Sequence, residues 1–130
     1  MSATAEAQAM LRAALVDLET LRLMVEATTF ASPSVGLHAQ QCAEKAVKAW
    51  LLYALGEPAR THDIDWLLRR LASHGENAAP WRRLGLYTPF AGWVRYADPA
   101  KPIPPLDQER ALRDAEAICQ HVAELIGSAR

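Results

Sequence analysis

Apolar residues in this chain recur at steps of three and four positions through most of the segments that lie between its prolines and glycines. Near the N-terminus the pattern is formed by Leu11, Ala14, Leu15, Leu18, Leu21 and Val25. This spacing is typical of one face of an α-helix, whereas a half-buried strand would alternate apolar and polar residues. No window of the sequence shows that alternation. The chain is therefore predicted to be all-α.

Prolines, glycines and capping residues set the expected limits of the helices. Ser32, Thr61 and Asp107 are predicted N-caps, because short polar side chains accept hydrogen bonds from the first free amides of a helix. A kink or break is expected at Pro89, inside the fourth helix. The pattern indicates a mostly antiparallel up-and-down bundle of about five helices, in a single domain over residues 1–130. The expected helices cover about residues 4–28, 32–56, 61–75, 78–96 and 107–127, with a proline-rich surface loop over 97–106.

The composition is that of an ordinary globular protein without a large charge excess. Hydrophobic residues make up 51% of the 130 positions, and 14 basic residues nearly balance 15 acidic ones. A balanced chain lacks the overall positive field with which non-specific nucleic-acid binders attract phosphate, so any anion site must be local. We expect no membrane span and no secretory signal, and hence a cytoplasmic protein.

The sequence carries no pattern that indicates a cofactor or a metal. Cys42 and Cys119 have no CxxC pair or His/Cys ligand spacing around them. No glycine-rich phosphate loop and no Ser/His/Asp order can be read elsewhere. We therefore expect neither a metal site nor a cofactor. Both cysteines are predicted to be buried in separate helices and to stay unlinked in the presence of an oxidant.

Three segments of the sequence contain its most distinctive strings of residues. The first reads LHAQQCAEKAVKAWLL from Leu37 to Leu52, the second reads RTHDI from Arg60 to Ile64, and the third reads WVRYADP from Trp93 to Pro99. In this order, the three segments resemble the HEPN family. In HEPN domains the second helix has a similar His-Ala-Gln-Gln start, the following turn has a His-Asp pair, and the fourth helix ends in an Arg-Tyr-Pro-like segment. In this chain two residues separate that tyrosine from the proline, which follows directly in many members.

The resemblance implies a helical bundle that is frequently a homodimer and is often encoded beside a minimal nucleotidyltransferase. Roles proposed for the family are recognition of a nucleotide or substrate and cleavage of RNA. We expect a non-catalytic module that binds a nucleotide-like ligand, a nucleotidyltransferase partner or both, as in a two-protein toxin-antitoxin system. The alternatives are a metal-independent ribonuclease at a dimer cleft and a structural dimerisation domain. Four tryptophans also favour a homodimer, since a short bundle encloses so many large side chains with difficulty.

The candidate ligand-binding side chains lie in the same three segments. One group shares a flank of the second helix, beside its apolar face. A second group lies where a loop meets the N-terminus of the third helix, whose free amides attract anions. The third group closes the fourth helix, where an arginine can bind phosphate through two N–H groups. In this order they are His38, Gln41 and Lys45, then Arg60, His62 and Asp63, and finally Arg95 and Tyr96.

Each group also has a purely structural interpretation. Glu44 can pair with Lys48 one turn later, and Thr61 and Asp63 can act as ordinary helix caps. Arg95 can pair with Asp98 or hold the proline-rich loop in place. If the three groups instead meet on one concave surface, we expect that surface to be locally positive and to bind an anion.

The ribonuclease signature of the family is an arginine followed by a histidine after four to six residues. Arg69 and His74 alone meet that spacing. Arg70 stands next to Arg69 where a polar residue such as asparagine is usual, and the pair falls at a predicted helix C-terminus, where basic residues complement the helix dipole. We therefore interpret the spacing as chance and predict no catalytic residue.

Overall fold

The computed structural model of the protein describes residues 3–95 and 105–127, and of residues 93–95 the backbone alone. Within these ranges the chain forms α-helices and one 3-10 helix, and it contains no strand. This architecture confirms the predicted all-α fold class. The elements are α1 (Ala3–Ala27), α2 (Ser32–Leu55), α3 (Ile64–Ser73), η1 (Ala79–Tyr87), α4 (Thr88–Arg95) and α5 (Gln108–Gly127).

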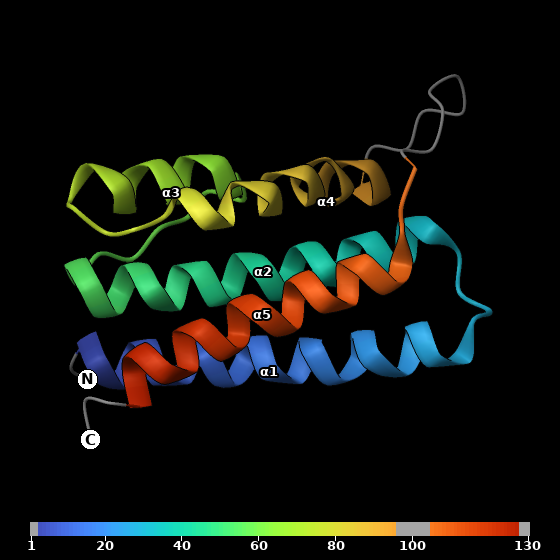
Figure 1. The fold of residues 1–130 in the computed structure, drawn as a ribbon, viewed down its shortest axis with the longest axis horizontal. Helices are drawn as coiled ribbons and strands as arrows, with labels where there is room; N and C mark the ends of the chain where they lie inside the picture. The colour runs from blue at the N-terminus through green and yellow to red at the C-terminus, as the bar shows by residue number, and fades with distance from the viewer. Residues whose placement is uncertain (1–2, 96–104, 128–130) are drawn as a thin grey trace.

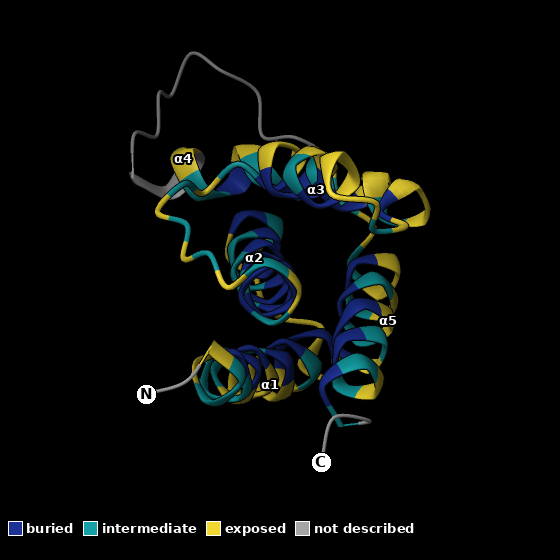
Figure 2. Cartoon of the chain, turned by 90° about the vertical axis from the view of Figure 1, so that its left-hand side faces the viewer, coloured by how far each residue is buried: buried dark blue, intermediate teal, exposed yellow. Residues whose placement is uncertain are grey.

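The central element of the bundle is α2. Both α1 and α5 pack against it and against each other, while α3, η1 and α4 form a row along another side of α2 (Figure 1). The end-on view in Figure 2 shows the same layers, with α2 between that row and α1. α1 and α2 run in opposite directions, whereas α5 runs parallel to α2 and antiparallel to α1 (Figure 1). The bundle is therefore only partly of the up-and-down kind that the sequence predicted.

Small residues on α2 allow its neighbours to approach closely, and the approach buries polar side chains of α2 as well. Trp50 is 2% exposed, and the polar residues Gln40 and Glu44 are 1% and 7% exposed. Buried polar groups need hydrogen-bond partners, so Gln40 and Glu44 indicate a polar network inside the bundle that could belong to a functional site. The alanines with at most 1% exposure on this helix are Ala39, Ala43, Ala46 and Ala49.

A glycine on α2 creates the seat for α4. A β-carbon on Gly36 would lie 2.3 Å from the ring of Phe90, and that ring is itself 2% exposed. Since real β-carbons do not approach other atoms so closely, the phenyl ring can take this position over glycine alone. This contact fixes the first turn of α4 beside α2.

The predicted N-cap of the third helix is wrong by two residues. The cap of α3 is Asp63, whose carboxylate accepts a hydrogen bond from the amide of Trp66 (3.3 Å). Thr61 lies two residues earlier, where its hydroxyl accepts a hydrogen bond from the Asp63 amide (3.0 Å). The side chains of Thr61 and Asp63 therefore both bond backbone amides and order the loop that enters α3.

Of the two other predicted N-caps, Ser32 is wrong and Asp107 is confirmed. Ser32 and Pro33 already belong to the first turn of α2, so its N-cap is Ala31, which has no side-chain hydrogen bond to offer. At α5 the predicted cap is confirmed, because the Asp107 carboxylate accepts a hydrogen bond from the Arg110 amide (3.0 Å).

The predicted fourth helix consists of two pieces of different geometry. Residues Ala79–Tyr87 form the 3-10 helix η1, and α-helical geometry begins at Thr88. The expected break near Pro89 is thus present, and the proline occupies the first turn of the second piece. A first-turn position suits proline because no amide donor is needed there.

The two cysteines are buried in separate helices, as predicted, but their side chains touch. The Sγ atoms of Cys42 in α2 and Cys119 in α5 are 3.5 Å apart. The contact with the Cys119 thiol and burial raise the pKa of Cys42, which suppresses its reactive thiolate form. The same contact lowers the pKa of Cys119. That oxidant leaves the two cysteines unlinked stays a prediction.

A candidate ligand-binding groove

A groove of about 810 Å³ lies beside α2, between the loop that enters α3 and the first turns of α4. It contains four of the predicted ligand-binding residues, from two of the three sequence segments. We call it the α2 groove. Its lining residues are Leu37, Gln40, Gln41, Glu44 and Lys45 from α2, Thr61, His62 and Asp63 from the loop, and Thr88, Pro89, Ala91 and Gly92 from α4.

Glu44 is the centre of the hydrogen-bond network in this groove. Its carboxylate accepts hydrogen bonds from the Gln40 amide (2.5 Å), from the Lys48 ammonium (2.9 Å) and from Nδ1 of His62 (3.0 Å). The predicted pairing of Glu44 with Lys48 is therefore present, but it is one part of a larger cluster. Sequence reasoning missed Glu44 as a site residue. The available signal was the spacing of Gln40, Glu44 and Lys48 at successive helical turns.

His62 joins the groove from the loop that precedes α3. Its side chain is 63% exposed, although its Nδ1 atom is hydrogen-bonded to the buried carboxylate of Glu44. A carboxylate offers lone pairs and no proton, so in the neutral ring Nδ1 carries the hydrogen and Nε2 carries a free lone pair. The imidazole is thus held in one tautomer while its other nitrogen remains available in the groove.

Lys45 is paired, contrary to the expectation of a locally positive surface. Its Nζ atom lies 2.6 Å from the carboxylate of Asp17, which α1 brings to the edge of the groove. Lys48 is likewise neutralised by Glu44. An acid from a helix distant in sequence therefore balances the charge, and the described lining residues do not form the cationic cluster that we predicted.

The loop side of the groove is tied to the start of α4. The Ile64 amide donates a hydrogen bond to the hydroxyl of Thr88 (3.3 Å), so the first turns of α3 and α4 are linked directly. Asp63 caps α3 and also faces the groove. Local hydrogen bonds consequently hold the side chains of this wall in place without a bound ligand.

Two of the predicted site residues lie outside the groove, and two more cannot be placed in it. Nδ1 of His38 bonds the Ser34 carbonyl oxygen of its own helix (2.9 Å), and this side chain does not line the groove. Arg60 is exposed and also does not line it. The side chain of Arg95 and the whole of Tyr96 lie outside the described residues.

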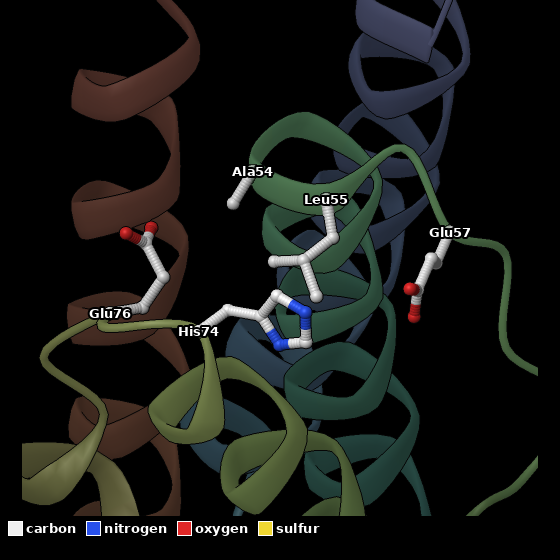
Figure 3. A pocket seen from close by; sticks show the side chains of 5 residues that line it. All are labelled: Ala54, Leu55, Glu57, His74 and Glu76. Atoms are coloured by element: carbon white, nitrogen blue, oxygen red, sulfur yellow. The ribbon is translucent and has the colours of Figure 1, made fainter.

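Arg69 and His74, the pair with ribonuclease-like spacing, do not share a site. Arg69 lines a cavity of about 380 Å³ together with Arg82. His74 lines a different cavity of about 300 Å³ at the end of α2, where Figure 3 shows it next to Leu55, between Glu76 and Glu57. The two side chains therefore serve different surfaces, which supports the interpretation of their spacing as chance.

The fold and the groove define a small all-α domain whose candidate binding site is built on its central helix. A family model described as the HEPN domain matches residues 7–125. The chain belongs to the HEPN domain family, as its three characteristic segments indicated. Comparisons with curated proteins and with solved structures gave no match.

Within the part of the chain that the structure describes, no helix is long and apolar enough to span a membrane. No group of three or more His, Cys, Asp or Glu side chains within residues 3–95 and 105–127 is arranged to hold a metal ion.

Proposed function

We propose that this HEPN domain is a non-catalytic module whose α2 groove binds a nucleotide-like ligand. The observation that carries the proposal is that two HEPN-like segments supply one groove, in which polar side chains converge over a mainly apolar surface. Sites for small molecules typically have this composition, and the volume of about 810 Å³ is within their usual range.

The lining residues suggest how such a ligand would lie. Leu37, Pro89 and Ala91 offer apolar surface to the flat face of a base. The amide of Gln41 can both donate to and accept from the base edge. Arg95 follows Ala91 by one turn of α4, and we include its guanidinium, with Tyr96, as the phosphate-binding group of the proposal.

Titration of the full chain with AMP and with CMP, followed by two-dimensional NMR, tests the proposal. We expect shifts to concentrate on the α2 groove and expect Gln41→Ala to weaken binding about fivefold, the usual worth of one hydrogen bond. His38→Ala is the matched control, since it lies on the same helix outside the groove. Shifts that scatter over other surfaces, or no binding at millimolar nucleotide, would argue against a nucleotide site.

The proposal also assigns the chemistry of the system to a partner. Membership of the HEPN family supports a minimal nucleotidyltransferase as that partner, in a two-protein toxin-antitoxin arrangement, with this chain as a homodimer. Co-purification from the native host followed by mass spectrometry should recover such a nucleotidyltransferase. Recovery of this chain alone would favour the alternative of a structural dimerisation domain.

RNA cleavage is the second candidate, because Glu44 orients His62 as a general base would be oriented. Nε2 could remove the proton of a ribose 2′-hydroxyl while that oxygen attacks the adjacent phosphate, which releases the 5′-oxygen and leaves a cyclic phosphate. The leaving oxygen would take its proton from water or from a second protomer.

Incubation of the full chain with single-stranded RNA in the presence of EDTA tests this candidate. Cleavage that disappears in His62→Ala and persists in His74→Ala would establish it. Intact RNA after long incubation would leave the non-catalytic proposal as the better account.

A further inference from the structure

We propose that the α2 groove selects bases that carry an exocyclic amino group, as adenine and cytosine do, and that Nε2 of His62 accepts a hydrogen bond from that group. This inference rests on the proposed nucleotide-binding function and adds the chemical feature that the ligand must present. It follows from the directions of the hydrogen bonds around Glu44.

In its hydrogen bond with His62, the carboxylate of Glu44 can only be the acceptor. Its Oε2 atom is bonded to the Lys48 ammonium (2.9 Å), and its Oε1 atom receives the amide N–H of Gln40 (2.5 Å). At 7% exposure the carboxylate has little access to water that could replace these partners. An ionised carboxylate between such donors has no hydrogen to give to an imidazole.

The neutral ring of His62 is therefore restricted to the tautomer with hydrogen on Nδ1. Nδ1 lies 3.0 Å and 3.2 Å from the two oxygens of Glu44. Its Nε2 atom then carries the lone pair, on a side chain that is 63% exposed and lines the groove. An acceptor in this place favours a ligand atom that bears hydrogen.

The other described polar groups of the groove do not oppose this preference. Asp63 presents a carboxylate, which accepts. Lys45, the single ammonium among the described lining residues, is held by Asp17 at 2.6 Å. Gln41 can donate or accept through its amide, so it adapts to the ligand.

The hydroxyls of Thr61 and Thr88 accept from the Asp63 and Ile64 amides and keep one O–H each, so they too can donate or accept. The groove therefore contains acceptors that cannot donate, at His62 and Asp63, and a base with an exposed N–H₂ group matches them.

A matched pair of nucleotides isolates the amino group. Purine riboside 5′-monophosphate differs from AMP by the absence of the 6-amino group, while the sugar, the phosphate and the stacking face are the same. At pH 8.5, so that the neutral ring is the form under test, calorimetry should show AMP binding about fivefold more tightly, as expected for one hydrogen bond.

Two substitutions connect this ratio to His62 and Glu44. His62→Ala changes an exposed side chain and should reduce the affinity ratio of the two nucleotides to about one, whereas His74→Ala should leave it unchanged. Glu44→Gln can present an N–H to Nδ1 and so move the ring hydrogen to Nε2, which should also abolish the preference for AMP. If Glu44→Gln fails to fold, the His62→Ala comparison decides the question by itself.

The tautomer can be measured without any nucleotide. Imidazole ¹⁵N chemical shifts of the full chain at pH 8.5 should show Nδ1 of His62 protonated, and the Nε2-protonated form would overturn the inference. If AMP and purine riboside 5′-monophosphate bind equally, amino-group selection is wrong while the nucleotide site stands. If neither nucleotide binds, the proposed function fails and the selection fails with it.

Discussion

At the scale of single residues, Glu44 is the group on which the α2 groove most depends. It is almost buried, yet it receives hydrogen bonds from Gln40 and Lys48 of its own helix and from His62 of the following loop. An acid in this position links the central helix to the entrance of α3. The same interaction that could serve a ligand therefore also stabilises the fold.

Substitution of Glu44 by alanine should destabilise the protein by about 3 kcal/mol, because it leaves the Lys48 ammonium uncompensated in a largely buried place. Urea denaturation followed by circular dichroism measures the change. Lys45→Ala is the comparison, since it disrupts a more exposed ion pair with Asp17 and should cost at most about 1 kcal/mol. Equal losses in the two variants would contradict the central place of Glu44.

At the scale of elements, a close contact places α4 on α2, and hydrogen bonds to one carboxylate link η1 to α5. Gly36 admits the ring of Phe90 between the first pair. The hydroxyl of Tyr87 donates to the carboxylate of Asp114 (2.5 Å), which joins the second pair and also accepts from Arg83 (3.0 Å). Both contacts hold the upper row of helices that forms one wall of the groove (Figure 1).

Gly36→Ala should destabilise the protein by about 1–3 kcal/mol, because the added methyl group would overlap the buried ring of Phe90. Thermal denaturation measures the effect. Gly92→Ala is the matched control in α4, where an added β-carbon meets no atom within 4 Å. That control should gain up to about 1 kcal/mol from the higher helix propensity of alanine. A neutral Gly36→Ala variant would show that α4 can shift at little cost.

Stability should decline above about pH 10 in a way that depends on Tyr87. Burial and the hydrogen bond to Asp114 raise the pKa of Tyr87 in the folded protein. The resulting stabilisation is complete below the ordinary tyrosine pKa and is lost as pH rises through the folded value, since the unfolded chain ionises first. Urea denaturation at pH 8 and pH 10.5 should show a smaller decline for Tyr87→Phe. An identical decline in both proteins would exclude this explanation.

At the scale of the whole molecule, the exposed apolar side chains gather along α1 and the loop that follows it. The tryptophans that first suggested a dimer do not all contribute, because Trp50 is buried while Trp66 is 43% exposed on α3. The outer face of α1 is the stronger reason to expect one. Its exposed apolar residues are Leu15, Val16 and Leu23, continued by Phe30 in the loop.

We expect a homodimer in which two copies of α1 pack antiparallel. Val16 and Leu23 are 65% and 61% exposed, and Arg12 and Glu26 flank them, so a two-fold axis would set opposite charges against each other. Light scattering should report a dimer at about 50 μM, and a double substitution, Val16→Lys with Leu23→Lys, should yield a monomer. Leu86→Lys, with equal exposure of 61% on η1, is the control. A monomeric wild type would refute the dimer.

The sequence by itself determined the helices, their ends to within three residues, and the family, because these depend on local properties. Apolar periodicity defines a helix face within a few turns. Gly56 and Gly75 adopt positive φ angles of 68° and 85°, which suit the residue that follows the end of a helix. The segments around Gln41 and His62 could also be assigned to one groove, because they belong to elements that follow each other in the sequence. The 3-10 geometry of η1 could not be predicted, because its residues, with Pro80 in the first turn, are equally compatible with an α-helix.

The tertiary structure alone decided which side chains are paired. Asp17 reaches Lys45 and removes the expected positive charge, although 28 positions separate them in the sequence. Arg69 and His74 have a suggestive spacing, yet they face different cavities. Glu44 looked like half of an ordinary helical ion pair until the fold placed His62 against it. Hydrogen bonds and charges act over a few ångströms in space, so their partners depend on how helix faces meet and not on their order along the chain.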